Sequence, residues 1–407
     1  MNTITILGAA GRIGEACAQA FLAAGWRVRG VARGTKLATL VQGVEPVEAN
    51  AMDRKSLIEA CRGSDIILHA LNPAYDQWEA TVMPFAHNVL AAAKETGATV
   101  MIPGNVYNYG TTIGMDMCED RPFAADTSKG KIRVEVEQLF ADAADGGVRT
   151  IVLRGGDFFG GKRLETWLDL MILKDLKKGK FVWPGPYDLS HAFAYLPDFA
   201  ETFVRVANKR QALPAFSALN FEGHTLTGNQ MKRAVEEITG KSLKSGNVPW
   251  FLIRLVGLFN PVLKAVVEMS YLWRVPHSMD GRKLAALVDV PKTPIAEALR
   301  QTIADQKLGQ KIYRITRYVL GQRRCDRSRT YIVCIRQHSY LRADILVDHL
   351  FLHVRGNRRH RISNAMTLIY RRFCGFWLGF DRWSSPLWDH ILQRRISAQT
   401  LDGSARI

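Results

Sequence analysis

The stretch that decides the fold is Thr3–Gly14, TITILGAAGRIG, near the start of the chain. Its first half is rich in β-branched residues and predicts a buried strand. Gly8, Gly11 and Gly14 follow with GxxGxxG spacing and open a helical pattern. Glycine permits a tight turn, lets a pyrophosphate approach the backbone and lets the helix pack on the strand. The stretch therefore predicts a dinucleotide-binding turn, with phosphate at the helix N-terminus.

Short β-rich runs alternate with helical patterns from this stretch through Arg154. We predict helices over residues 12–24, 54–61, 78–95 and 129–144. The β-rich runs between and after them are WRVRGVAR, DIILHAL, TVMIPG and RTIVLRG. Strands separated by helices of this length form right-handed βαβ units and a parallel sheet covered on both faces. The predicted fold class is therefore α/β, with a doubly wound parallel Rossmann sheet.

The pattern changes after Arg154 to longer helices and to loops that contain Pro and Trp. Residues 248–269 predict two amphipathic helices broken at Asn260-Pro261, and a role at a membrane surface is the alternative. A last helix is expected to end near Gln306. We predict three regions: a dinucleotide-binding domain over 1–154, a small, mostly helical cap on the substrate side over 155–308, and an atypical C-terminal tail over 309–407.

The tail differs in composition from the rest of the chain. From Ile312 onward there are 18 Arg and 6 Asp but no Lys or Glu, so this segment holds 12 of the 17 net positive charges. A nucleic-acid-binding arm is one interpretation, but such arms mix Lys with Arg, and the tail lacks zinc-type Cys/His spacing. We favour a non-native or poorly ordered extension, such as out-of-frame translation, and expect neither a nucleic-acid partner nor a metal site.

The other features that bear on location favour a cytoplasmic protein. Cys17, Cys61 and Cys118 are scattered, which is typical of a reducing compartment rather than of a disulfide framework. The opening run, MNTITIL, lacks the layout of a signal peptide, and we expect no transmembrane segment. No pattern in the sequence predicts an oligomeric state.

The end of the second strand decides which dinucleotide is expected. Arg33 stands where NAD-binding domains carry Asp or Glu on the ribose 2′-hydroxyl, and no carboxylate is expected nearby. Arg33, assisted by Arg12 in the glycine loop, would bind the 2′-phosphate of NADP. A solvated surface arginine is the alternative reading. We therefore predict NADP(H) as the cofactor, with NAD as the alternative.

The ends of the third and fourth strands supply the remaining cofactor contacts. Asn50 and Asp53 are expected at the adenine edge, and residues 69–73, HALNP, beside the pyrophosphate and nicotinamide ribose. His69 lies among apolar neighbours and predicts a hydrogen-bonded core histidine rather than a catalytic one. The predicted cofactor-binding residues are Gly8, Gly11, Arg12, Ile13, Gly14, Arg33, Asn50, Asp53, Ala70 and Leu71.

These motifs resemble the atypical and extended short-chain dehydrogenase/reductases, which include epimerase/dehydratase-like, NmrA-like and isoflavone-reductase-like members. The resemblance covers residues 1–306 and rests on GAAGRIG, DIILHAL, PGNVYNYG, RGGDFFG and YLPDFAE. Extended members carry a serine after the fifth strand and Tyr-x-x-x-Lys on the next helix. The matching positions here are Asn105, Lys129 and Arg133, so all three family residues are replaced. An epimerase or dehydratase would therefore need an altered active site.

The helix that begins in TSKGKIRVEVEQLF, 127–140, resembles isoflavone-reductase-like enzymes, which carry Lys-x-x-x-Arg-x-x-x-Glu there. Lys129, Arg133 and Glu137 match that spacing. The resemblance implies that Lys129 is a general acid/base working beside hydride delivery from NADPH. The spacing places the three side chains on one helix face, where Arg133 favours the neutral lysine and Glu137 could pair with Arg133. A solvated face with i,i+4 pairs is the alternative.

The loop after the fifth strand holds the other catalytic candidates. Tyr107 and Tyr109 are alternative proton donors, and Asn105 is expected to hydrogen-bond a substrate carbonyl. Asp157 and Asp198 are expected to cap or orient loops near the cleft. Two hypotheses follow: an NADP-dependent reductase acting on a small carbonyl or unsaturated substrate, or a non-catalytic, NmrA-like dinucleotide sensor that regulates a partner.

Overall fold

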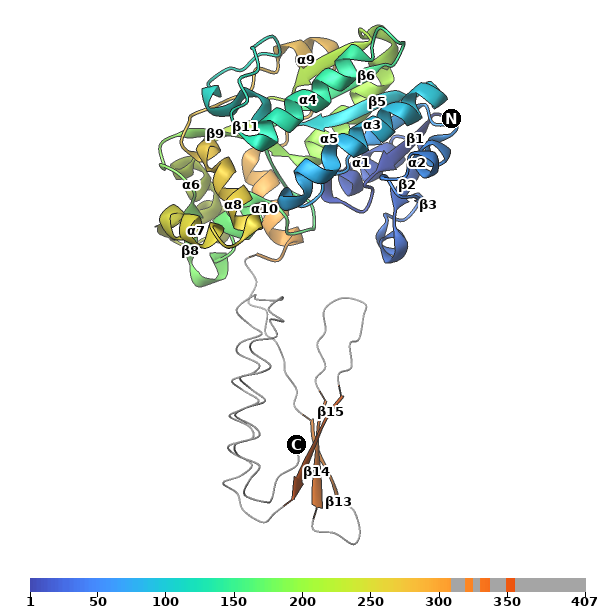
Figure 1. Ribbon diagram of the computed structural model, residues 1–407. Helices are drawn as coiled ribbons and strands as arrows, with labels where there is room; N and C mark the ends of the chain where they lie inside the picture. Colours follow the sequence, from blue (N-terminus) through green and yellow to red (C-terminus); the bar gives the residue numbers. More distant parts are fainter. Residues whose placement is uncertain (309–318, 325–329, 337–348, 356–407) are drawn as a thin grey trace. The chain divides into compact units, whose positions relative to one another are not determined.

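The computed structural model of the protein describes residues 1–308, 319–324, 330–336 and 349–355 (Figure 1). The chain divides into two units, Met1–Lys311 and Ile312–Ile407. In the second unit, three strands form an antiparallel sheet: β13 (Val319–Arg324), β14 (Thr330–Arg336) and β15 (His349–Arg355). The expectation of a non-native or poorly ordered tail falls mainly on residues outside the described part, and it stays a prediction.

A seven-stranded parallel sheet forms the centre of the first unit, in the order β10-β6-β5-β4-β1-β2-β3. Its strands are β1 (Thr3–Leu7), β2 (Arg27–Ala32), β3 (Glu45–Glu48), β4 (Ile66–His69), β5 (Thr99–Gly104), β6 (Thr150–Arg154) and β10 (Phe216–Asn220). The chain winds outward in both directions from β1, so the strand order reverses between β1 and β4. Doubly wound sheets bind their ligands at that switch point, outside the carboxyl ends of the strands. The predicted fold class is confirmed.

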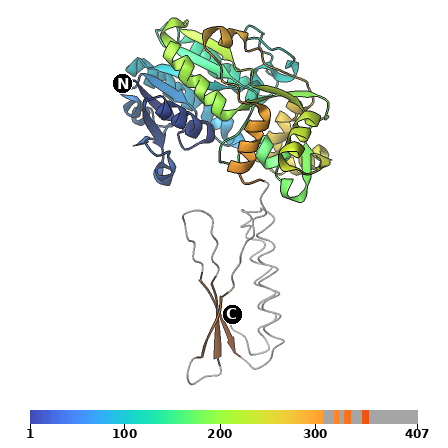
Figure 2. The ribbon, with the colours of Figure 1, turned by 180° about the vertical axis from the view of Figure 1, so that it is seen from behind.

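Helices cover both faces of this sheet (Figures 1 and 2). One face carries α1 (Arg12–Ala23) and α5 (Leu196–Lys209); the other carries α2 (Arg54–Cys61), α3 (Trp78–Thr96) and α4 (Ser128–Asp142). Alternate residues of a strand point to opposite faces. In β4, Ile66 and Leu68 accordingly pack in one apolar core with α1 and α5, and Ile67 packs in the other with α2, α3 and α4. The four predicted helices are confirmed to within two residues at each end.

The chain beyond Arg154 combines short strands with helices. The strands are β7 (Asp157–Phe159), β8 (Lys180–Trp183), β9 (Ser190–Tyr195), β11 (His224–Thr227) and β12 (Lys244–Asn247), in two small sheets, β11-β9-β7 and β12-β8. The helices are α6 (Gly228–Thr239), α7 (Trp250–Gly257), α8 (Pro261–Glu268), α9 (Arg282–Leu287) and α10 (Ile295–Asp305). The predicted break at Asn260 is confirmed, because its side chain caps α8. The expected regions interleave, since α5 and β10 return to the main sheet.

Candidate functional site

The glycine turn between β1 and α1 has the geometry that a dinucleotide needs. Gly8 adopts φ 81°, which favours glycine, and a Cβ there would lie 2.7 Å from the Ala70 carbonyl oxygen. A Cβ on Gly14 would collide with the backbone of Gly8, so this glycine allows α1 to pack on the turn. At Gly11 the one atom within 4 Å of a Cβ is the Gly8 carbonyl oxygen, at 3.2 Å. The space above Gly11 is therefore open for a pyrophosphate at the N-terminus of α1.

Arg12 does not join Arg33, and in this respect the prediction of a two-arginine clamp is wrong. The Arg12 guanidinium is buried, lies 2.8 Å from the Asp169 carboxylate and donates to the Gly160 carbonyl. Gln306 at the end of α10 reaches the same segment, donating 3.0 Å to the Gly161 carbonyl. Arg12 thus ties the glycine turn to the chain after β7, because a buried guanidinium needs a carboxylate partner.

Arg33 follows β2 and is exposed, as a residue that binds a ribose phosphate would be. The expectation that no carboxylate lies nearby is wrong, since Glu48 at the end of β3 accepts a 3.1 Å bond from the Gly34 backbone N–H. A carboxylate on this backbone amide favours a ribose hydroxyl, whereas Arg33 favours a phosphate. The two side chains therefore favour different dinucleotides.

The polar residues after β3 bond to their own loop. The Asp53 carboxylate caps α2 by accepting from the backbone N–H groups of Lys55 and Ser56, at 3.0 and 3.1 Å. The Asn50 side-chain oxygen accepts from the Met52 N–H at 3.2 Å. These bonds shape the loop that is expected at the adenine edge.

His69 at the end of β4 is buried, as predicted, but it is not the fully hydrogen-bonded core histidine that we expected. Its Nδ1 has no partner among the described residues. Burial lowers the pKa of His69 from 6.5 to about 3, and the charge of Arg133 acts in the same direction. His69 is therefore a neutral imidazole with a free ring nitrogen in the interior, next to Arg133.

A side-chain cap and a glycine allow the first turn of α4 to pack closely against the loop after β5. Thr127 caps the helix, accepting from the Gly130 N–H at 3.1 Å. A Cβ on Gly130 would lie 2.6 Å from the Tyr107 carbonyl oxygen, so only glycine lets α4 approach this closely. Lys129, one residue earlier, is buried at the same place. The Ser-Lys-Gly order thus positions a lysine beside the loop of Tyr107.

Lys129 pairs with the last residue of α8. Its ammonium lies 2.5 Å from the Glu268 carboxylate at the end of α8, and its backbone N–H donates to the other carboxylate oxygen at 3.2 Å. The side chain of Lys129 is 5% exposed and that of Glu268 is 24% exposed. A carboxylate at a helix N-terminus is also stabilised by the helix dipole. The Lys129 ammonium therefore lies directly against a carboxylate, a partner that the spacing on α4 did not predict.

Two tyrosines flank Lys129. The Tyr75 hydroxyl lies 2.9 Å from that of Tyr107, and the Lys129 ammonium lies 5.4 Å from the centre of the Tyr75 ring. Burial raises the pKa of both phenols, and the charge of Asp157 acts in the same direction on each. Both tyrosines are therefore neutral donors near physiological pH. Asn105 also lies in this loop, where its side-chain oxygen accepts from the Tyr107 N–H at 3.0 Å.

Arg133 lies one turn after Lys129 and over the ring of Trp78, with 4.7 Å from the guanidinium carbon to the ring centre. Burial lowers the pKa of Arg133, but an arginine remains charged at neutral pH. No ion pair holds it within the described part of the chain, and its buried Nε has no hydrogen-bond partner there. A half-buried cation with a free donor is a ready partner for an anionic or carbonyl oxygen of a ligand.

Glu137 binds Arg154 rather than Arg133. Its carboxylate lies 2.6 Å from the Arg154 guanidinium and accepts from the Asn108 side chain at 2.9 Å. Arg154 also donates to the Tyr109 hydroxyl at 3.2 Å. All four side chains are buried. The structure therefore places Tyr109 in a buried polar network between α4 and β6, whereas Tyr107 lies beside Lys129.

The chain beyond Arg154 adds further polar groups, beginning with Asp157 in β7. The Asp157 carboxylate pairs with the His191 ring, with 2.8 Å between Oδ2 and Nε2, and His191 stacks on Trp273 with 3.9 Å between the ring centres. The Tyr271 hydroxyl is buried without a partner among the described residues, and burial raises its pKa. Asp198 orients a loop, as expected, by accepting from the backbone and side chain of Thr293, each at 2.7 Å.

Sequence reasoning missed Tyr75 and Glu268, although both lie beside Lys129. Tyr75 had a weak signal, because it follows the end of the fourth strand, where ligands of doubly wound folds lie. Glu268 had none. It is the first acidic residue after Glu237 and falls at the end of an amphipathic helix, where nothing local predicts its partner.

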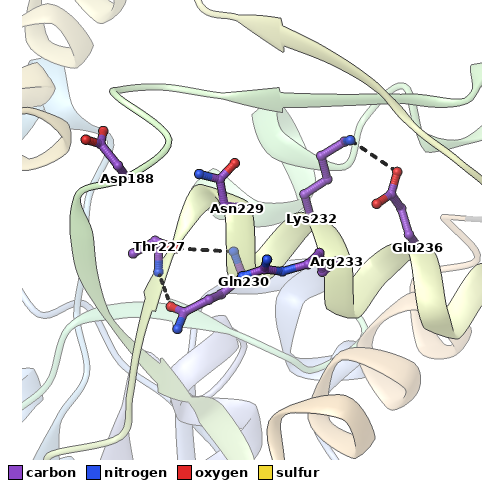
Figure 3. Close-up of a pocket in the computed structure, with 7 residues that line it drawn as sticks. All are labelled: Asp188, Thr227, Asn229, Gln230, Lys232, Arg233 and Glu236. Carbon is purple, nitrogen blue, oxygen red and sulfur yellow. Dashed lines mark hydrogen bonds and ion pairs between the residues drawn. The ribbon is translucent and has the colours of Figure 1, made fainter.

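A separate hollow of about 350 Å³ lies at the start of α6 (Figure 3). Its walls include a capping box, in which the Thr227 side chain accepts from the Gln230 N–H and the Gln230 side chain accepts from the Thr227 N–H. None of the predicted site residues lines it. Over the described residues, no His, Cys, Asp and Glu side chains gather as a metal site, and no helix is long and apolar enough to cross a membrane.

Solved structures with this fold include epimerases in complex with NAD. UDP-glucuronic acid 4-epimerase from Bacillus cereus, in complex with UDP-glucuronic acid and NAD, has a TM-score of 0.60 at 16% identity, over 75% of this chain and 99% of that chain. UDP-glucose-4-epimerase from Stenotrophomonas maltophila, with bound NAD and formylated UDP-arabinopyranose, has a TM-score of 0.61 at 17% identity, over 75% of this chain and 98% of that chain. At this identity the likeness supports the fold.

Two sequence comparisons go further. A 2-alkyl-3-oxoalkanoate reductase from Shewanella oneidensis is 32% identical over 107 residues, which are 26% of this chain and 27% of that reductase. The model of the NmrA-like family matches residues 1–274, which include the glycine turn, the α4 helix and the Lys129–Glu268 pair. The resemblance drawn from the sequence motifs is confirmed, and the chain belongs to the NmrA-like family.

Proposed function

We propose that this protein is an NADPH-dependent reductase of a small carbonyl or unsaturated substrate, with Lys129 as the proton donor. The observation that carries the proposal is the buried Lys129 ammonium, held 2.5 Å from Glu268 and next to the neutral phenols of Tyr75 and Tyr107. A reduction consumes one hydride and one proton. An ammonium fixed in a partly dry site supplies the proton without waiting for solvent.

The glycine turn and the ends of the strands would hold the dinucleotide. The open space above Gly11 accepts the pyrophosphate, and the exposed Arg33 attracts the 2′-phosphate of NADP. Arg133, with its free Nε, stands where the family's ribose-binding lysine is expected, and is a donor for the nicotinamide ribose or for the substrate. The cofactor, when bound, supplies the hydride. Arg12 is paired with Asp169, and Glu48 accepts a hydrogen bond from the Gly34 N–H. The proposed preference for NADP therefore rests on Arg33 alone.

The chain's own residues would do the acid chemistry as follows. Lys129 donates its Nζ proton to the substrate oxygen or carbon that becomes protonated, and Glu268 holds the ammonium in position beforehand. The Tyr107 hydroxyl, bonded to Tyr75, donates a hydrogen bond to the substrate and orients it. Arg133 stabilises the negative charge that develops on a carbonyl oxygen. The name of the Shewanella oneidensis relative supports a reductase of an oxo group.

The experiment compares Lys129→Ala with the matched control Lys131→Ala, in NADPH oxidation by the full chain over a panel of carbonyl and enone substrates. Lys131 is exposed on the same helix. A general acid contributes about 10²- to 10⁴-fold, so Lys129→Ala should lose that much of kcat while NADPH binding is kept. Lys131→Ala should retain full activity. Equal activity of the two variants would contradict the role of Lys129.

A second function, a non-catalytic dinucleotide sensor, is favoured by one observation. The Lys129 ammonium and the Glu268 carboxylate satisfy each other without a substrate, as a structural pair would. In that case NADPH binds, no substrate of the panel is reduced, and Lys129→Ala changes stability rather than turnover. Tight NADPH binding without oxidation by any carbonyl would favour the sensor.

A further inference from the structure

The helical hairpin formed by α7 and α8 exposes an apolar surface that the proposed reaction does not use. Seven of the thirteen exposed large apolar side chains in the described part of the chain lie within residues 251–262. Phe259, in the turn, is 90% exposed. We call this the hairpin surface; its main residues are Phe251, Leu252, Leu255, Val256, Leu258 and Phe259.

Helix geometry makes this surface continuous. Residues four apart share a helix face, so Phe251 and Leu255 line up, as do Leu252 and Val256, and both pairs run toward the turn at Leu258. The two helices pack against each other. They lie at one end of the first unit, in the same region as α6 and β8 (Figure 1). A helix on the surface of a soluble domain normally turns polar residues outward. Clustered exposed apolar side chains mark a surface that binds something.

The charged residues of the two helices indicate what kind of partner the hairpin surface binds. Arg254 and Lys264 are exposed on the two helices, and residues 248–267 contain no Asp or Glu. The first acidic residue after them, Glu268, is bound to Lys129. An apolar surface whose own two helices carry exposed cations and no carboxylate before Glu268 fits a bilayer that contains anionic lipids, because the apolar side chains enter the acyl boundary while the cations meet the headgroups.

We propose that the hairpin surface docks on the face of an anionic lipid bilayer, with Leu258 and Phe259 entering first. A second copy of the chain fits less well. In a two-fold contact the hairpin surfaces of two copies face each other, so Arg254 and Lys264 of one copy would approach the same two cations of the other, and the two helices supply no free carboxylate to pair with them. Each helix of eight residues is too short to cross a bilayer, so the hairpin lies along its surface.

Docking would bring lipid close to the candidate site. Helix α8 begins in the exposed turn and ends at Glu268, whose carboxylate holds Lys129. The hairpin therefore joins the hairpin surface directly to the Lys129 site. The docking itself does not depend on the proposed reduction, and it is measured without cofactor or substrate.

The test is cosedimentation of the full chain with phosphatidylcholine vesicles, with and without phosphatidylserine, at physiological and at high ionic strength. High salt screens the attraction between lipid and the cations of the chain, including the 18 Arg from Ile312 onward, which all variants share. The test variant is Leu252→Asp/Phe259→Asp. The matched control is Leu170→Asp, since Leu170 and Leu252 are each 57% exposed.

Wild type and Leu170→Asp should bind phosphatidylserine vesicles at both ionic strengths, and the test variant should bind at least about tenfold more weakly. Arg254→Gln/Lys264→Gln should weaken binding to phosphatidylserine vesicles and leave binding to phosphatidylcholine vesicles unchanged. Equal binding of the test variant and wild type at high salt would overturn the proposal. The proposal would also be overturned if wild type did not bind vesicles but formed a dimer by size-exclusion chromatography, and if the test variant no longer formed that dimer.

Discussion

The Lys129 ammonium lies 2.5 Å from the Glu268 carboxylate, although 139 residues separate them in the chain. The side chain at the end of α8 therefore holds both the first turn of α4 and the proposed proton donor. The α4 helix covers one face of the main sheet and α8 belongs to the α7–α8 hairpin, so the pair also joins these two elements. Its strength can be measured apart from any activity.

A double-mutant cycle with Lys129→Met and Glu268→Gln should give a coupling of about 1 to 3 kcal/mol in the free energy of unfolding. The pair is mostly buried, so removing one partner leaves a poorly solvated charge. Urea denaturation of the four proteins provides the measurement. The exposed pair Arg62–Glu59, 2.6 Å apart, is the control and should couple far more weakly. Similar couplings for the two pairs would mean that Lys129 is well solvated.

Arg33→Ala should weaken NADPH binding by at least about tenfold and leave NADH binding unchanged, because only NADPH carries the 2′-phosphate. Glu48→Gln should strengthen NADPH binding, since it removes a negative charge from the Gly34 amide. Fluorescence titration with both dinucleotides measures the change. A loss of both cofactors in Arg33→Ala would show that Arg33 does not read the phosphate.

Arg154→Met should lower the free energy of unfolding by about 3 to 5 kcal/mol, because it leaves the Glu137 carboxylate buried without its cation. Glu135→Gln, at an exposed position of the same helix, should change it by less than about 0.5 kcal/mol. Thermal and chemical denaturation give both values.

Tyr109→Phe tests whether the Tyr109 hydroxyl, which belongs to the buried Glu137–Arg154 network, has a structural or a catalytic role. It should cost about 1 kcal/mol of stability, since one buried bond from Arg154 is lost, and should leave kcat unchanged. A large loss of kcat in Tyr109→Phe would return Tyr109 to the list of proton donors.

Stability should fall as the pH is lowered below about 6.5. Burial lowers the pKa of His69 and of His277 from 6.5 to about 3, so between these values the unfolded chain binds more protons than the folded one. Each histidine then removes up to about 1.4 kcal/mol of stability per pH unit. His69→Gln and His277→Gln should each flatten the slope measured by urea denaturation at pH 5 to 7. His87→Gln, at an exposed position, should not.

Local pattern was enough to predict the main sheet, its helices and the glycine turn. The residues on one face of a strand or helix are two, three or four positions apart in the sequence, so a short stretch shows the pattern. The glycine turn is also local, because its own backbone geometry requires Gly8 and Gly14. The strands β8 and β12 were not predicted, because a strand of four residues has too few residues to show a period. The site was predicted as a set of candidates on α4 and the loop after β5.

The sequence by itself determined that Lys129, Arg133 and Glu137 share one helix face. Only the tertiary structure decided their partners, which are Glu268, the ring of Trp78, and Arg154. It likewise paired Arg12 with Asp169, 157 residues away. Helix periodicity fixes which side chains lie together on one element, but an ion pair forms only within about 4 Å. That distance depends on how separate elements pack, and packing is a property of the whole folded chain.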